Sequence, residues 1–110
     1  MKLPHRKKAY IREEKLIEYV LSETHTVGRL KAKFFRSAGF SESNVSILKE
    51  SLLAIARSQE VKEVKTSDYG NKYIIDGRIK APKGNIISVR TLWNIETNQQ
   101  SPRFVTTYPV

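Results

Sequence analysis

The spacing of apolar residues changes once along this chain, close to Gln59. Before that point, apolar residues recur about every three or four positions, as on one face of a helix; after it they alternate with polar residues, as in a half-buried strand. The chain is therefore predicted to place all its helices before all its strands. The predicted helices cover Ile11 to Leu21, about Thr26 to Ser37, and about Asn44 to Ser58.

The second half contains four predicted strands. Their sequences are VKEVKTS, KYIIDGRIK, NIISVRTLWNIE and RFVTTY. The connections between them are short and carry Gly, Asn or Pro, which favours hairpins between antiparallel neighbours. We therefore predict an α+β fold with three N-terminal helices packed on one face of a four-stranded antiparallel meander sheet.

Length and composition limit the organisation and the chemistry. With 110 residues, we expect a single domain over residues 1–110, with a basic, flexible tail over residues 1–9. The chain has no cysteine and two histidines, so we expect no disulfide and no metal site. No glycine-rich phosphate-binding or dinucleotide-binding motif is present, and we expect no cofactor. The chain shows neither a signal peptide nor a membrane span, which favours the cytoplasm.

Charge points to the class of partner. Twenty Lys and Arg against eleven Asp and Glu give a formal net charge of +9. Such an excess favours a polyanionic partner, either nucleic acid or an acidic protein. On the sheet face turned away from the helices, we predict a nucleic-acid-binding surface, although the same pattern also suits an ordinary solvated face. The residues assigned to it are Lys72, Arg78, Lys80 and Arg90.

One lysine of the second predicted helix falls inside an apolar arc. On a helical wheel, Val27, Leu30, Phe34 and Ala38 share one side, and Lys31 lies within it. A buried, unpaired ammonium is costly, so Lys31 either extends its stem to reach solvent or lines a cleft. The opposite side, expected to face solvent, carries Arg29, Lys33 and Arg36.

Three other side chains could act together with Lys31. His25 precedes this helix and can exchange a proton near neutral pH, although a loop histidine is also commonly a solvated or capping residue. Thr106 and Tyr108 alternate onto one face of the last strand, where they either hydrogen-bond a phosphate or simply favour the strand. We predict that His25, Lys31, Thr106 and Tyr108 form one solvent-accessible site between the second helix and the last strand.

Several strings occur in a fixed order between Leu3 and Pro109. They are KLP, EYVLSETHTVGRLKAKFFRSAGF, YGNKYIIDGRI, VRTLWNIE and PRFVTTYP. This set resembles an uncharacterised bacterial domain family, whose members occur as small free-standing proteins and as C-terminal modules of polymorphic and contact-dependent toxins. Because the chain begins where the domain begins, we expect a free-standing protein without a delivery module.

The order of helices and strands is also similar to the barnase, EndoU, colicin and RelE group of ribonucleases. EndoU-type members use histidines, a lysine, and a Ser/Thr-x-Tyr pair on a late strand. The resemblance implies that His25 and Lys31 are the early pair, and that Thr106 and Tyr108 are the late pair. EndoU-type sites use two histidines, and His5 is poorly placed to be the second one, so the second acid/base group stays open.

The leading hypothesis is a metal-independent endoribonuclease of the toxin type. His25 would act as base or acid, Lys31 and Arg90 would stabilise the phosphate, and Thr106 and Tyr108 would donate hydrogen bonds or stack. The products would be a 2′,3′-cyclic phosphate and a 5′-hydroxyl. One alternative is a nucleic-acid-binding module without activity. Another is a toxin-derived interaction domain whose basic face meets an acidic antitoxin-like or immunity-like protein. No membrane partner is expected.

Overall fold

The computed structural model describes residues 1–22, 24 and 29–110. All its strands follow all its helices, so the predicted change near Gln59 is confirmed. The helical elements are η1 (Arg6–Lys8), α1 (Glu13–Lys15), η2 (Leu16–Val20), α2 (Arg29–Ser37), η3 (Glu42–Asn44) and α3 (Val45–Ser58). The strands are β1 (Glu63–Ser67), β2 (Gly70–Lys80), β3 (Ile86–Glu96) and β4 (Arg103–Pro109).

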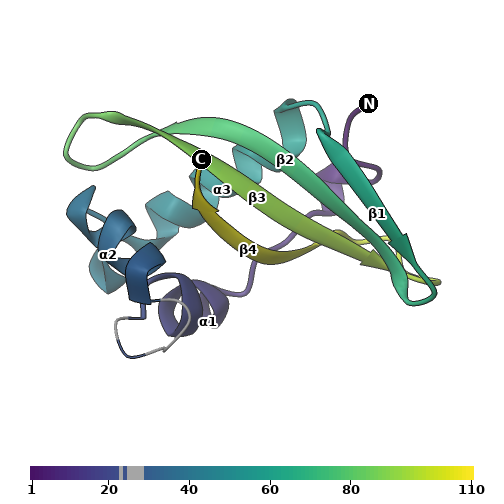
Figure 1. Cartoon of the computed structure of the whole chain (residues 1–110), viewed down its shortest axis with the longest axis horizontal. Helices are drawn as coiled ribbons and strands as arrows, with labels where there is room; N and C mark the ends of the chain where they lie inside the picture. Colours follow the sequence, from purple (N-terminus) through teal and green to yellow (C-terminus); the bar gives the residue numbers. More distant parts are fainter. Residues whose placement is uncertain (23, 25–28) are drawn as a thin grey trace.

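In the described part of the chain, the strands form one four-stranded antiparallel sheet in the order β1-β2-β3-β4. This is the predicted meander. Figure 1 shows α1, α2 and α3 as a layer beside the sheet, with β1 at the edge far from α1 and α2. The α+β fold with helices ahead of the sheet is therefore confirmed.

Alternation along β2 and β3 separates two sheet faces. The inner face carries the apolar side chains that pack against the helices, and Gly77 on this face lies directly against Ile55 of α3. The outer face carries the residues between them, which are mostly polar. The buried inner side chains of the two strands are Tyr73, Ile75, Ile79, Ile87, Val89, Thr91 and Trp93.

A β-bulge interrupts the alternation of β4. Leu92 of β3 lies opposite Thr106, whereas the next residue, Trp93, lies opposite Phe104, so Val105 is the extra residue of the bulge. As a result Phe104 and Thr107 are both buried on the inner side, three positions apart. The bulge thereby turns Thr106 to the outer face, together with Tyr108 two positions further along the strand.

The second helix docks on a different arc from the one predicted. Leu30, expected in the core, is 77% exposed, whereas Ala32 and Phe35 are fully buried. Arg36, expected to be solvated, is partly buried; its Nε donates to the carbonyl oxygen of Leu21 at 2.9 Å. These two assignments were wrong because several apolar residues of this helix lie outside a single arc, and the contacts of α2 with η2 and β4 select among them. The predicted first turn, residues 26–28, lies outside the described residues.

The first nine residues, expected as a flexible tail, pack against the rest of the chain. Leu3 and Ala9 belong to the hydrophobic core. The terminal amino group of Met1 lies 2.8 Å from the carboxylate of Glu60, and Lys2 forms a β-bridge with the same residue. The basic side chains of this segment thus project from a backbone that is anchored by its few apolar residues.

Candidate functional site at the edge between α2 and β4

Lys31 and Tyr108, which the sequence analysis placed in one site, lie in contact. Helix α2 packs beside β4, and the Nζ of Lys31 lies 5.1 Å from the centroid of the Tyr108 ring. The negative face of an aromatic ring attracts a cation at this distance. Lys31 is partly buried, so its stem follows the apolar face of α2 while its ammonium lies on the ring at the edge of the sheet.

An open groove adjoins this contact. It has a volume of about 460 Å³ and is lined by Leu30, Lys31, Tyr108 and Pro109. Its walls are largely apolar, because Leu30 and Pro109 contribute hydrocarbon and Tyr108 contributes a ring. The exposure of Leu30 therefore creates an apolar wall next to a positive charge.

Arg90 connects this edge with the centre of the sheet. It lies opposite Tyr108 in the β3–β4 register and opposite Asp76 in the β2–β3 register. Its guanidinium donates two hydrogen bonds to the Asp76 carboxylate, from Nε at 2.7 Å and from Nη2 at 3.0 Å. Hydrogen bonding to Asp76 raises the pKa of Arg90, and Tyr108 adds a smaller effect in the same direction. Arg90 thus remains a cation that is held by Asp76 on one side and lies beside Tyr108 on the other.

Asp76 is the acid of the outer face that pairs with Arg90 of this site. Hydrogen bonding to Arg90 lowers its pKa, and the ammonium of Lys62, at 3.5 Å, lowers it further. These contacts join five side chains into one continuous row across the sheet, which we call the charged row. Its members, in order, are Lys62, Asp76, Arg90, Tyr108 and Lys31.

The other two predicted catalytic residues are Thr106 and His25. Thr106 is partly buried on the outer face, opposite Leu92 and one row away from Tyr108. The neighbouring Thr107 points inward and donates to the carbonyl oxygen of Arg90 at 2.8 Å. His25 lies outside the described residues. The structure therefore brings Lys31 and Tyr108 together and leaves Thr106 close along the strand.

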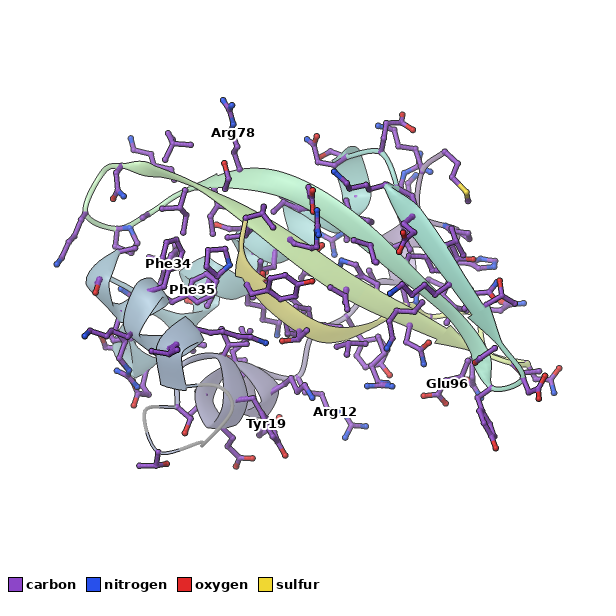
Figure 2. The ribbon with its side chains drawn as sticks, viewed as in Figure 1. Arg12, Tyr19, Phe34, Phe35, Arg78 and Glu96 are labelled. Carbon is purple, nitrogen blue, oxygen red and sulfur yellow. The ribbon has the colours of Figure 1, made fainter. Side chains whose placement is uncertain are left out.

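The four cations predicted to bind nucleic acid separate into distinct environments. Arg78 and Lys80 are exposed near the end of β2, and no ion pair to them occurs among the described residues. Figure 2 shows Arg78 projecting from the sheet on the side opposite α1 and α2. Lys72 is partly buried and lies opposite Lys65 of β1. Arg90 is held by Asp76 within the charged row.

Two further features bear on chemistry and location. Over residues 1–22, 24 and 29–110, no group of three or more His, Cys, Asp and Glu side chains could hold a metal ion. Within the same residues, every helix is too short or too polar to cross a membrane.

Sequence reasoning missed two parts of this site. The Asp76–Arg90 pair depends on strand register, and although Arg90 was expected on the outer face, nothing local places Asp76 opposite it. Leu30 and Pro109 form the walls of the groove, and the apolar character of Leu30 pointed to the core instead. A signal for its exposure existed in Lys31, since a helix face with a charged residue next to Leu30 is a poor candidate for complete burial.

Comparisons with known proteins concern the family and the fold. The family described as Domain of unknown function (DUF6883) matches residues 2–110. No curated protein matches the chain. Among solved structures, a chain of the contact-dependent growth inhibition toxin–immunity protein complex from Klebsiella pneumoniae 342 is similar, with a TM-score of 0.74 and 18% sequence identity. The similarity covers 96% of each of the two chains and, at this identity, shows a shared fold.

Proposed function

We propose that this chain, which belongs to the family described as Domain of unknown function (DUF6883), is a toxin-type endoribonuclease that needs no metal ion. The observation that carries the proposal is the Lys31 ammonium over the Tyr108 ring at an open groove, with Arg90 on the adjacent strand. The fold likeness to a chain of a contact-dependent toxin–immunity complex supports the toxin-type assignment.

RNA supplies its own nucleophile, the 2′-hydroxyl group. The protein then has to move two protons and to stabilise the charge that develops on the phosphorus oxygens. Lys31 is suited to the second task, because its ammonium is a compact charge at the rim of the groove. We assign proton transfer to His25, four positions before the first residue of α2, and a supporting hydrogen bond to the phosphate to Thr106.

Tyr108 and Arg90 act as a pair in this proposal. The ring of Tyr108 lies against the Lys31 ammonium, and the Tyr108 side chain contributes to the raised pKa of Arg90. Arg90 in turn is fixed by Asp76 through two hydrogen bonds. We therefore propose that Arg90 does not bind the phosphate directly and is a positioning residue that acts through Tyr108.

A second function is favoured by charge and by the same fold likeness. A chain with a net charge of +9 is electrostatically complementary to an acidic protein, and the structural neighbour comes from a toxin–immunity complex. In this reading an acidic immunity-like protein binds the chain and covers the groove. We propose the cytoplasm as the location of the ribonuclease function, because RNA is accessible there.

The test is hydrolysis of purified RNA by the full chain in the presence of EDTA, followed by analysis of the RNA ends. We expect 2′,3′-cyclic phosphate and 5′-hydroxyl ends. His25→Ala should lower the cleavage rate by roughly 10²- to 10⁴-fold, the usual contribution of a positioned acid or base. Lys31→Met should also abolish most cleavage, whereas Lys33→Met, which removes an exposed charge from the same helix, should not.

The other outcomes separate the alternatives. Cleavage that requires a divalent cation would reject the metal-independent mechanism. RNA binding without cleavage by the wild-type chain would favour a nucleic-acid-binding module. Absence of both, with tight binding of an acidic protein, would favour the interaction domain.

A further inference from the structure

Most cations of the outer face stand in ion pairs, but among the described residues Lys72, opposite Lys65, and the two cations near the β2–β3 turn have none. Toward β1 and the far end of β3, Lys65 pairs with Glu63 at 3.8 Å and Arg103 pairs with Glu96 at 3.3 Å. Figure 2 shows Glu96 at the end of the sheet opposite the helices α1 and α2. Toward the β2–β3 turn, in contrast, Arg78 is exposed without an ion pair among the described residues. Lys80, two positions along the same face, shares this state.

A second groove lies beside Arg78. It has a volume of about 580 Å³, and its lining includes Asp76, Arg78, Ser88 and Val110. The amide of Val110 donates to the carbonyl oxygen of Ser88 at 3.2 Å, so the end of the chain runs along β3 at this point. The two grooves therefore flank one short segment: Pro109 lines the apolar groove, and Val110 lines the second one.

The chemistry of the two grooves is complementary to the two parts of a nucleotide. The groove at Leu30 and Tyr108 offers apolar side chains and an aromatic ring, which suit the flat face of a base. The second groove offers the guanidinium of Arg78 and the hydroxyl of Ser88, which suit a phosphate, while the Asp76 carboxylate in the same lining is paired with Arg90 and Lys62. The next row of the sheet pairs Lys80 with Ile86, a second unpaired cation beside an apolar side chain that is 59% exposed.

We propose that a single-stranded RNA segment crosses the outer face from the apolar groove to the exposed end of β2. One base packs against Leu30, Tyr108 and Pro109, and the following phosphates bind Arg78 and Lys80. This inference rests on the proposed function, because the same strand passes the ammonium of Lys31. It adds the substrate class, an unpaired strand, and the direction in which it extends from the site.

A single strand fits this surface better than a duplex. From β4 to β2 the path crosses two strand spacings, about 10 Å, and it also advances two positions along the strands to reach Arg78, about 7 Å. In a duplex the bases are stacked on each other, and their faces cannot enter a side groove. In a single strand they are available to pack on apolar and aromatic side chains.

Binding is measured with a fluorescent 2′-O-methyl RNA oligonucleotide, which has no free 2′-hydroxyl and cannot be cleaved by this reaction. Arg78→Ala/Lys80→Ala is compared with Arg6→Ala/Lys7→Ala, which removes the same charge from exposed positions of η1. We expect the first pair to lower the slope of log affinity against log salt by about 1.4, since each single-strand phosphate contact contributes about 0.7. The control pair should leave the slope within about half a contact of the wild type.

The base-binding groove is tested with Leu30→Ser, and Ile47→Ser on α3 serves as a control at another exposed apolar residue. Loss of the apolar contact between Leu30 and the base should weaken binding by about threefold or more in Leu30→Ser and leave the control unchanged. A duplex of the same sequence should bind the wild-type chain more weakly than the single strand does.

The outcomes distinguish this inference from the proposed function. If the wild-type chain cleaves RNA in EDTA but the Arg78/Lys80 and Leu30 variants bind like their controls, the path is rejected and the ribonuclease assignment stands. If the single strand binds as predicted without being cleaved when its 2′-hydroxyls are free, the path stands and catalysis is rejected. If the duplex binds equally well, or if only an acidic protein competes for these residues, the single-strand inference is wrong.

Discussion

Arg90 of β3 donates two hydrogen bonds to the carboxylate of Asp76 on β2, from Nε at 2.7 Å and from Nη2 at 3.0 Å. Both side chains are about 70% buried. The arrangement is bidentate, which makes it stronger and more directional than an ordinary surface ion pair. Arg90 also lies opposite Tyr108, so it stands between an acid of β2 and an aromatic residue of β4 that lines the groove.

Replacing Asp76 by Asn should change stability in a pH-dependent manner. The folded-state pKa of Asp76 is lowered, chiefly by hydrogen bonding to Arg90, so its stabilising effect is present above the ordinary carboxyl pKa and is lost as the pH falls through the lowered value. At neutral pH, Asp76→Asn should therefore lower the free energy of unfolding by about 1 kcal/mol, and in acid the difference from the wild type should vanish.

Urea unfolding at several pH values measures this effect. Asp68→Asn, a change at an exposed carboxylate, is the control and should track the wild type. Part of the acid sensitivity should persist in every variant, because the pKa values of Glu42 and Glu60 are also lowered. A stability difference for Asp76→Asn that stays constant down to pH 2 would contradict a charge-dependent role.

Tyr108 can be separated into its ring and its hydroxyl. Tyr108→Phe keeps an aromatic face under the Lys31 ammonium but removes the oxygen near Arg90. If the hydroxyl contacts the reacting phosphate, RNA cleavage should fall by roughly 10²-fold while the melting temperature is retained. Tyr108→Leu should lower cleavage further, since it also releases Lys31. Tyr69→Phe, at an 85% exposed side chain, is the matched control, and equal activity of all three variants would remove Tyr108 from the mechanism.

Thr91 is predicted to be essential for stability although it is a polar residue in the core. Its hydroxyl donates to the carbonyl oxygen of Ile75 at 2.7 Å and accepts from the indole nitrogen of Trp93 at 2.8 Å. Thr91→Val keeps the shape but leaves the buried Trp93 donor unpaired, so the free energy of unfolding should fall by about 1 to 3 kcal/mol. Fluorescence of the single tryptophan during urea unfolding reports the change. Thr66→Val, at an exposed position of β1, should be nearly neutral; a neutral Thr91→Val would show that another group accepts the indole N–H.

Gly77 is required by a close approach between α3 and β2. A Cβ atom at this position would lie 2.7 Å from Cγ1 of Ile55 and 2.8 Å from its Cδ1, in a side chain that is 3% exposed. Gly77→Ala should therefore destabilise the fold by about 1 to 3 kcal/mol through overpacking. The double variant Gly77→Ala/Ile55→Ala should be more stable than the sum of the two single effects predicts, because the larger cavity accepts the added methyl group. Strict additivity in chemical denaturation would argue against the contact.

Local periodicity and the short connections together predicted the order of the elements and the antiparallel meander. These features depend on interactions between near neighbours: the period of a helix or a strand decides which side chains share a face, and short polar connections leave only the adjacent strand as a partner. The sequence also identified Lys31 as anomalous and placed it with His25, Thr106 and Tyr108 in one predicted site; of these, Tyr108 has its ring centroid 5.1 Å from the Nζ of Lys31.

Other features were decided by tertiary structure. Apolar residues of α2 fall on overlapping arcs, and packing of the helix against η2 and β4 buried Ala32 and Phe35 and left Leu30 exposed. The bulge at Val105 and the pairing of Asp76 with Arg90 depend on strand register, which joins residues far apart in the sequence. The physical reason is the same in each case: hydrophobicity specifies that a side chain favours burial, whereas the space available in the packed core decides which competing side chains are buried.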